Sequence, residues 1–244
     1  MIFPVGIPGN KDNSRPYMTY LLVGINIIVF IWEVLYTQIY GIEAFNQVMM
    51  AIAFNVCEIG TRSTPHLALD SLRSMFLHGG IMHILGNMVF LVIFGRKIEK
   101  YFGAIPFLAF YLLAGYGATI AHAMFSGVIC TPADPYGLVI GASGAVAGVL
   151  GAFLLLFPTM PINTQVAIIP PFIGWNFKVP AMFYLLYFFL MDFVQGLGWY
   201  VEEGTNVAYW GHIGGFLFGF LLVFIATIFW KPAPKQDPFA YLDD

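Results

Sequence analysis

The chain has 244 residues, of which 59% are hydrophobic and only 9% are charged, with 10 Lys and Arg against 13 Asp and Glu. Soluble domains carry about 25% charged residues, so this composition excludes a soluble enzyme, a nucleic-acid-binding protein and a disordered chain. A polytopic membrane protein remains. Its length allows six spans of about 20 residues each, with connecting loops but no second large domain.

Six apolar stretches predict an all-α, six-transmembrane-helix bundle. In chain order they cover residues 18–36, 80–94, 105–125, 143–157, 179–194 and 209–230. A polar segment precedes the first stretch and no cleavage site of small residues follows it, so we expect an uncleaved helix rather than a signal peptide. The chain is then expected to divide into a cytoplasmic N-terminal segment (1–17), a membrane domain (18–230) and a cytoplasmic tail (231–244).

The basic residues are distributed unevenly between the two sides of this predicted bundle. Eight of the ten Lys and Arg lie on the side of the termini, whereas only Arg62 and Arg73 lie on the other side, in the long connector 37–79. Positively charged residues stay in the cytoplasm, so we expect both termini inside and this connector outside. We therefore expect a multi-pass protein of a prokaryotic inner membrane. Within the connector, residues 41–55 have the mixed pattern of an interfacial amphipathic helix.

The fourth stretch is too short to cross the bilayer. Its 15 residues before Pro158 would reach about 22 Å, against a hydrocarbon core of about 30 Å. Residues 137–141 must then enter the bilayer as irregular backbone, which is tolerated only beside protein or a water-filled cavity. Ser143 would lie at a helix N-terminus facing that cavity, where free N–H groups suit an oxyanion. Taken alone, Ser143 could equally be an N-cap or a small packing residue.

His212 lies early in the sixth stretch, and ionisable residues inside a membrane are costly and usually functional. Small residues recur every fourth position in two stretches, a spacing that allows helices to approach closely. The glycines concerned are Gly144 and Gly148 in the fourth stretch and Gly211, Gly215 and Gly219 in the sixth. If these faces meet, His212 comes close to Ser143 and supplies a general base to a nucleophile. The alternative is a histidine that bonds to a carbonyl within the bundle.

Three further polar residues gather near the outer end of the second stretch. His83 and Asn87 are four residues apart, on one helix face, and His78 precedes them in the loop. They could aim hydrogen-bond donors into the same cavity. A metal site is the alternative, but no intramembrane carboxylate accompanies the histidines and Asn is a poor zinc ligand. We therefore expect no metal and no cofactor.

These motifs together resemble the signature of the rhomboid intramembrane serine proteases, over about residues 17–230. The motifs are His78-x-x-x-x-His83-x-x-x-Asn87, Gly141-Ala142-Ser143-Gly144 and Gly211-His212-Ile213-Gly214-Gly215. The resemblance implies that Ser143 is the nucleophile and His212 its base, a dyad without a third acid. It also implies an oxyanion hole made by His83, Asn87 and the Ser143 backbone N–H.

The resemblance further implies structural roles and a substrate class. The residues with structural roles near the site would be His78, Gly141, Gly144, Gly211 and Gly215. The implied function is a serine endopeptidase in the lipid bilayer that cleaves single-span transmembrane proteins near the outer face. No cofactor, metal or nucleic acid takes part.

The sequence departs from the family pattern at two positions. Some relatives have a Tyr one turn after the nucleophile that packs on the catalytic imidazole, whereas this chain has Ala147. Another group must therefore orient His212. The first outer loop has Leu72-Arg73 where many relatives have Trp-Arg. After the second stretch, Arg96, Glu99 and Gly103 resemble the family's cytoplasmic loop and are interpreted as structural.

The remaining polar residues are interpreted without a catalytic role. We expect His122 to be packed and hydrogen-bonded, His66 to be solvated, and Glu33 and Asp192 to reach interfacial water near the outer helix ends. Cys57 and Cys130 are both predicted outside, where a disulfide could join them.

Two other functions stay open. One is a catalytically inactive relative that binds membrane clients for quality control, but loss of Ser143 or His212 would mark that class and both are present. The other is a small transporter, which predicts polar residues along the pathway at both ends rather than near one side only.

Overall fold

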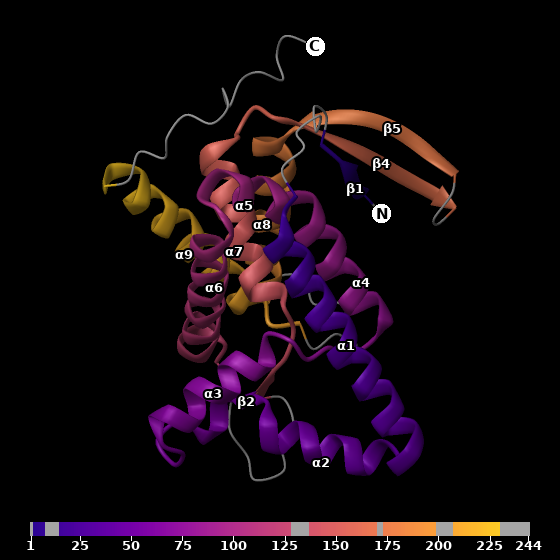
Figure 1. Cartoon of the computed structure of the whole chain (residues 1–244), viewed down its shortest axis with the longest axis vertical. Coiled ribbons are helices and arrows are strands. Elements are labelled where there is room, and N and C mark those ends of the chain that lie inside the picture. The colour runs from indigo at the N-terminus through magenta and orange to yellow at the C-terminus, as the bar shows by residue number, and fades with distance from the viewer. Residues whose placement is uncertain (1, 8–14, 128–136, 170–172, 199–206, 230–244) are drawn as a thin grey trace.

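The computed structural model describes residues 2–7, 15–127, 137–169, 173–198 and 207–229, mostly as helices along the long axis of the molecule (Figure 1). Each predicted apolar stretch forms a helix. They are α1 (Tyr17–Tyr40), α4 (Ile81–Phe90) continued through a π-helical turn (Leu91–Gly95) into α5 (Arg96–Phe102), α6 (Ala104–Phe125), α7 (Ser143–Leu156), α8 (Ala181–Gly196) and α9 (Tyr209–Phe229). The predicted polytopic helical bundle is confirmed.

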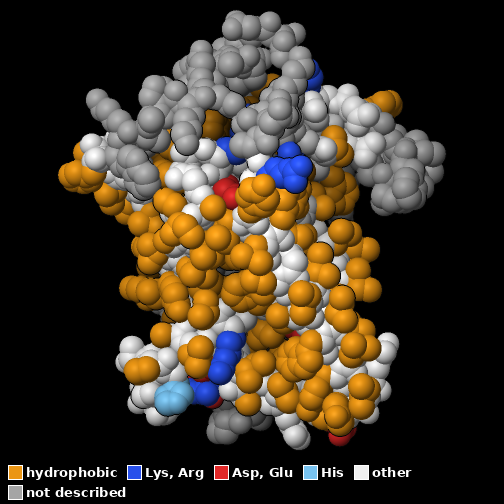
Figure 2. Space-filling view, viewed as in Figure 1, with side chains coloured by type: hydrophobic (Ala, Val, Ile, Leu, Met, Phe, Trp, Pro, Cys, Tyr) orange, Lys and Arg blue, Asp and Glu red, His pale blue; other side chains and the backbone are white. Residues whose placement is uncertain are grey.

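The surface of this bundle suits a bilayer. In the described part of the chain, four helical segments are long and apolar enough to span one: Tyr17–Tyr40, Ile81–Phe102, Ala104–Phe125 and Tyr209–Phe229. The apolar helices α7 and α8 are shorter, with 14 and 16 residues. Figure 2 shows hydrophobic side chains covering the middle of the molecule, with charged side chains towards its two ends. The chain is therefore a multi-pass membrane protein.

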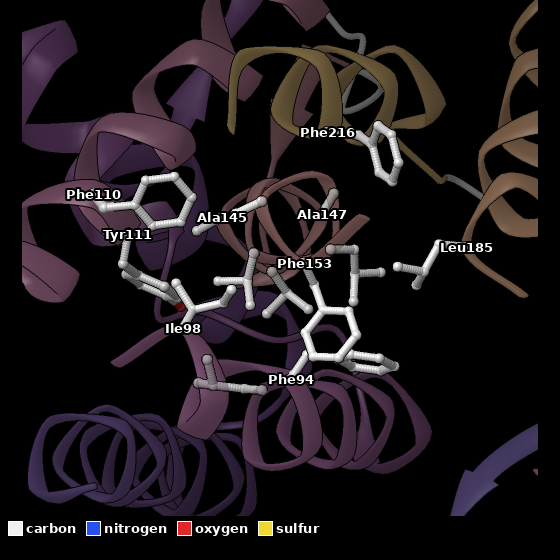
Figure 3. Close-up of a cluster of buried hydrophobic side chains, with 14 of the residues drawn as sticks. Phe94, Ile98, Phe110, Tyr111, Ala145, Ala147, Phe153, Leu185 and Phe216 are labelled. Carbon is white, nitrogen blue, oxygen red and sulfur yellow. The ribbon is translucent and has the colours of Figure 1, made fainter. Parts of the chain in front are cut away.

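Helix α7 lies at the centre of the bundle. All nine of its residues from 145 to 153 are buried, an arrangement typical of a helix that other helices surround. Side chains of the neighbouring helices close around it, among them Phe94, Phe110 and Phe216 (Figure 3). The ring of Phe153 meets that of Phe94 edge to face, with 5.0 Å between centroids. The shortest apolar helix thus avoids the problem of spanning lipid because protein covers it.

Helices α7 and α9 touch backbone to backbone along their glycines. A Cβ added to Gly215 would overlap the carbonyl oxygen of Gly144, and one added to Gly219 would overlap that of Gly148. One turn further along α7, a Cβ at Gly151 would overlap the carbonyl of Phe216. The predicted close approach of these faces is confirmed, and we call this contact the glycine seam.

Glu99 of α5 connects to the start of α1 at one end of the bundle. Its buried carboxylate accepts hydrogen bonds from the Met18 N–H at 2.8 Å, the Thr19 N–H at 2.7 Å and the Thr19 hydroxyl at 2.6 Å. These N–H groups belong to the first turn of α1, which has no acceptor within its own helix. A carboxylate is also favoured at a helix N-terminus by the helix dipole. The contacts fit the structural role expected of Glu99.

The opposite end carries a layer of short elements, α2 (Ile42–Ile52), β2 (Phe54–Asn55), α3 (Thr64–Ser74) and β3 (Leu138–Val139) (Figure 1). The amphipathic helix predicted in this region is α2. Strand β3 pairs with β2, and the Gly141 N–H then donates to the Ser74 carbonyl at 2.8 Å. The segment that leads to Ser143 is therefore non-helical and partly buried, with a short strand where irregular backbone was predicted, and it is tied to this layer. Cys57 of this layer is disulfide-bonded, and Cys130, the only other cysteine of the chain, lies outside the described residues.

The two basic residues of this layer are paired with acids. Arg62 contacts Glu58 at 2.7 Å and Asp70 at 3.3 Å, and Arg73 contacts Asp70 at 3.1 Å. The carboxylate of Asp70 is almost fully buried, so the pairs offset the cost of burying it.

A three-stranded antiparallel sheet lies at the Glu99 end of the molecule and was not predicted. Its order is β1 (Ile2–Gly6), β4 (Pro161–Ile169) and β5 (Ile173–Pro180), with Thr164 opposite Pro4 on one side and Phe177 on the other. The signal was present in β5, where Ile173, Trp175, Phe177 and Val179 alternate with small and polar residues. The fifth apolar stretch is predicted to begin at Val179, whereas Val179 and Pro180 are the last residues of β5 and the helix begins at Ala181.

Candidate active site

Ser143 is the first residue of α7, and strand β3 before it pairs with β2, in the layer that also holds α2 and α3. Its side chain is half-buried, and Ala142 before it is fully buried. The turn into the helix passes through Gly141, whose φ of +124° is open to glycine but strained for other residues. The first N–H groups of α7 have no acceptor within the helix. The hydroxyl therefore sits beside unused backbone donors.

His212 lies near the start of α9 and faces Ser143. Its Nε2 is 2.9 Å from the Ser143 Oγ, although the two residues are 69 positions apart in sequence. The glycine seam produces this contact, because without Cβ atoms the two helices come close enough for the side chains at their starts to meet. A neutral imidazole that accepts from the serine hydroxyl at Nε2 is arranged as a general base.

His83, on the first turn of α4, reaches the same place. The Gly79 N–H donates to its Nδ1 at 3.3 Å, so the neutral ring carries its proton on Nε2. That Nε2 lies directly over Gly141, where an added Cβ would be only 2.7 Å from it. A free N–H donor is therefore held beside the residues that precede Ser143.

Asn87 lies one turn after His83 on α4. Its side chain is 7% exposed, and its Nδ2 has no hydrogen-bond partner within the described residues. A buried amide donor without a partner costs about 1–3 kcal/mol, so its presence calls for a reason. A ligand oxygen that binds transiently would supply one.

His78 supports this arrangement from the loop before α4. Its side chain is 2% exposed and meets the ring of His83 edge to face, with 5.2 Å between centroids. Burial, with a smaller contribution from His83, lowers the pKa of His78 from 6.5 to about 4. The ring is therefore neutral near pH 7.

Glu33 of α1 is buried, contrary to our expectation that it reaches interfacial water. Its side chain is 3% exposed, and its Oε1 accepts the backbone N–H of His78 at 3.0 Å. The N–H at this point of the loop needs an acceptor because neither a helix nor water supplies one. The sequence could not reveal that α1 passes beside this loop.

A cavity of about 20 Å³ lies next to the dyad. Its lining includes Ser143, His212 and three hydroxyl-bearing residues, Ser71, Ser74 and Thr119. About 10–15 Å³ of such space is enough for one water molecule, provided that polar partners are in reach. The hydroxyls supply these partners, so the cavity can hold a single water beside Ser143.

Asp192 is the functional candidate that sequence reasoning missed. We expected it to reach interfacial water, but its Oδ1 lies 3.4 Å from the Nδ1 of His212, on the far side of the ring from Ser143. The side chains of Asp192 and His212 are 28% and 20% exposed. The only sequence signal was an acid near the outer end of an apolar helix.

The predicted packing of His122 and the predicted exposure of His66 are confirmed, but the hydrogen bond predicted for His122 is not found at its Nδ1 within the described residues. His122 is 8% exposed and packed in the bundle, although its Nδ1 has no hydrogen-bond partner in the described part of the chain. His66 is exposed and contacts the Ser63 hydroxyl at 2.6 Å. Among the described residues, no group of three His, Cys, Asp or Glu side chains is arranged to hold a metal ion.

Comparison with known proteins places this geometry in a family. The family model of the Rhomboid domain matches residues 65–229. The chain is 29% identical over 216 residues to "Rhomboid protease GluP" of Bacillus subtilis (strain 168), covering 86% of this chain and 34% of that protein. It is 32% identical over 154 residues to "RHOMBOID-like protein 6, mitochondrial" of Arabidopsis thaliana, covering 63% and 42%.

A third relative is more distant. "Rhomboid-like protease 3" of Toxoplasma gondii is 26% identical over 149 residues, covering 61% of this chain and 48% of that protein. The chain thus spans less than half the length of each of these relatives. The matched domain holds the seam and the residues of the candidate site, and it makes up more than half of the chain: this protein belongs to the rhomboid family.

Proposed function

We propose that this protein is an intramembrane serine endopeptidase in which Ser143 and His212 form the catalytic dyad. The observation that carries the proposal is the 2.9 Å contact between Ser143 Oγ and His212 Nε2 at the starts of two adjoining helices. Family membership supports it, since two of the relatives are named as proteases. The water-sized cavity beside the contact supplies room for the second reactant of a hydrolysis.

The chemistry follows from the positions of the groups. Ser143 Oγ attacks the scissile carbonyl carbon while His212 Nε2 takes the hydroxyl proton. The imidazolium then gives this proton to the leaving amine, and the peptide C–N bond breaks. A water molecule attacks the resulting ester while His212 takes a proton from it. That proton returns to Ser143 Oγ when the acid product leaves.

The negative charge on the carbonyl oxygen needs donors that are in place before it forms. We assign this role to His83 Nε2–H, to Asn87 Nδ2 and to the backbone N–H of Ser143. Asn87 supports the assignment because its buried donor has no partner within the described residues. Prearranged donors in a water-poor site stabilise a developing oxyanion more than the same donors would in water.

The proposed substrates are single-span transmembrane proteins, cleaved near the outer face. A membrane helix shields its own carbonyls by hydrogen bonding, so a substrate must unwind locally to reach Ser143. We expect entry past α8 and a preference for Gly or Pro in the outer half of the span. Replacing these residues by Leu in a model substrate should slow cleavage. Equal cleavage of the stiffened helix would show that unwinding does not select substrates.

The proposed location is a prokaryotic cell membrane, with the segments 1–17 and 231–244 in the cytoplasm and the membrane domain 18–230 between them. The candidate site then faces outward. Single cysteines introduced at Asn10 and Gln236, in a chain otherwise free of reactive cysteine, should resist an impermeant thiol reagent in intact cells. A cysteine at Gly204 should react. Labelling at the termini but not at position 204 would reverse the orientation.

The decisive experiment measures both labelling and proteolysis. The purified wild-type protein should react with a fluorophosphonate probe, and Ser143→Ala should abolish that reaction. Ser143→Ala and His212→Ala should each abolish cleavage of a transmembrane substrate, because members of one catalytic unit are each required. His66→Ala, which changes an exposed histidine, is the matched control and should retain activity. Cleavage by either dyad variant would refute the assignment of the dyad, whereas a wild type that neither labels nor cleaves would favour a client-binding or transport function.

A further inference from the structure

His212 needs a hydrogen-bond acceptor at its second ring nitrogen. A neutral imidazole carries one proton, and to act as a general base His212 must accept the Ser143 hydroxyl at Nε2, the nitrogen that lies 2.9 Å from Oγ. The proton therefore resides on Nδ1. Without an acceptor there, the ring could rotate or change tautomer, and it would then present N–H rather than a lone pair to the serine.

Asp192 supplies an acceptor at this nitrogen. Its Oδ1 lies 3.4 Å from Nδ1, and it comes from α8, a helix that does not carry either member of the dyad. Packing alone does not hold the ring on the side of α7, because Ala147, one turn after Ser143, offers only a methyl group. The ring of Tyr209, on the same helix as His212, is edge-on at 6.5 Å between centroids.

The place of Asp192 on its own helix is unfavourable for an acid. It lies in the last turns of α8, which ends at Gly196, and the helix dipole disfavours a negative charge near a C-terminus. Its side chain is also only 28% exposed. A carboxylate held there gains from a cationic partner, and the imidazolium that forms when His212 takes a proton is such a partner.

We propose that Asp192 is the positioning residue of the dyad, whose carboxylate accepts the Nδ1–H of His212 and holds Nε2 towards Ser143. The inference rests on the proposed function and extends it from a dyad to a Ser–His–Asp arrangement. The carboxylate also faces the positive charge on His212 during each proton transfer. Asp192 does not take up the proton, and it touches neither substrate nor reacting atoms.

The size of the effect follows from the geometry. Replacing a fully aligned, buried triad Asp by Asn lowers turnover by about 10⁴-fold. The distance of 3.4 Å here exceeds the about 2.7–2.9 Å of a charge-assisted hydrogen bond, and the pair is partly exposed. We therefore expect Asp192→Asn to lower turnover by about 10- to 100-fold, well below the loss in a fully buried triad.

The test uses the full chain, purified and reconstituted, with two substrates of different size. A small fluorophosphonate probe reports the reactivity of Ser143 alone, because no helix has to pass α8. A transmembrane substrate reports both this reactivity and the entry of the substrate past α8. Asp192→Asn keeps the shape of the side chain, and it should lower the labelling rate and kcat by about 10- to 100-fold with KM little changed. Asp192→Glu, which keeps the charge, should recover part of the loss.

Gln195→Ala is the matched control on the same helix end, because within the described residues the Gln195 amide bonds only to the Met191 carbonyl of its own helix, at 3.4 Å. It should label at the wild-type rate. Labelling is compared per folded molecule, measured by thermal unfolding of each variant. If Asp192→Asn labels within twofold of the wild-type rate, the inference is overturned. This holds even if cleavage of the transmembrane substrate slows, because the change would then affect substrate entry rather than the dyad. Failure of the wild type to label at Ser143 would instead refute the proposed function.

Discussion

Replacing Gly215 by Ala tests whether the glycine seam sets the distance between Ser143 and His212. A Cβ at this position would overlap the carbonyl oxygen of Gly144, the residue that follows Ser143. Both atoms involved are attached to helix backbone, so no side-chain rotation can relieve the overlap. The two helices must separate instead.

The expected size of the effect follows from ordinary contact distances. Carbon and oxygen atoms in contact lie about 3.5 Å apart, so α7 and α9 must separate by roughly 1 Å. The Oγ–Nε2 distance of 2.9 Å would then approach about 4 Å, which is no longer a hydrogen bond. A displacement of about 1 Å at reacting groups can lower the rate by about 10²-fold, and overpacking typically destabilises by about 1–3 kcal/mol.

The assay compares Gly215→Ala with Gly211→Ala, one turn away on the same helix. A Cβ at Gly211 would lie 3.6 Å from Ala208 and 3.7 Å from Ala118 and His122, which is ordinary contact. Fluorophosphonate labelling and thermal unfolding are measured for both variants. Gly215→Ala should lose about 10²-fold in labelling rate, whereas Gly211→Ala should stay near wild type. Equal behaviour of the two variants would refute the role of the seam.

Three further predictions concern residues around the site. Asn87→Ala should lower turnover by about 10²–10³-fold through loss of an oxyanion donor, with slower but measurable fluorophosphonate labelling; unchanged turnover would remove Asn87 from the oxyanion hole. Folding lowers the pKa of His78 from 6.5 to about 4. Between pH 4 and pH 6.5, His78 is therefore protonated in the unfolded chain but neutral in the folded protein. The free energy of unfolding should therefore decrease as pH falls from 6.5 towards 4, by up to about 1.4 kcal/mol per pH unit. Thermal unfolding of His78→Gln should show a shallower decrease than wild type, whereas His66→Gln should keep the wild-type slope. Glu99→Ala should lower the melting temperature because the three hydrogen bonds at the start of α1 are lost, yet labelling of the folded fraction should persist.

The helices could be predicted because hydropathy in a bilayer is a strong local signal. The apolar stretches 105–125 and 209–230 differ by at most one residue at each end from α6 and α9. The four-residue glycine spacing in the fourth and sixth stretches also predicted which helices would pack closely, because a helix face made of small residues allows the backbone of a neighbouring helix to approach.

The missed features depend on which segments become neighbours in space. Nothing in the sequence near Asp192 indicates that α8 places it beside His212, 20 positions further along the chain. The burial of Glu33 depends in the same way on a loop 45 residues later. Strand β1 lacks a clear alternating pattern, and its pairing with β4 is visible only once the fold is known.

The contacts that join Ser143 to the layer of α2, β2 and α3 affect how the protein responds to its membrane. The turn before Ser143 is held by the Gly141–Ser74 hydrogen bond and by the pairing of Val139 with Phe54. Bilayers of different thickness are accommodated by helix tilt and local lipid deformation. Because of these two contacts, such adjustments should move β2, α3 and the start of α7 together. The distance of Ser143 from these elements is therefore a property of the protein and does not follow the thickness of the bilayer.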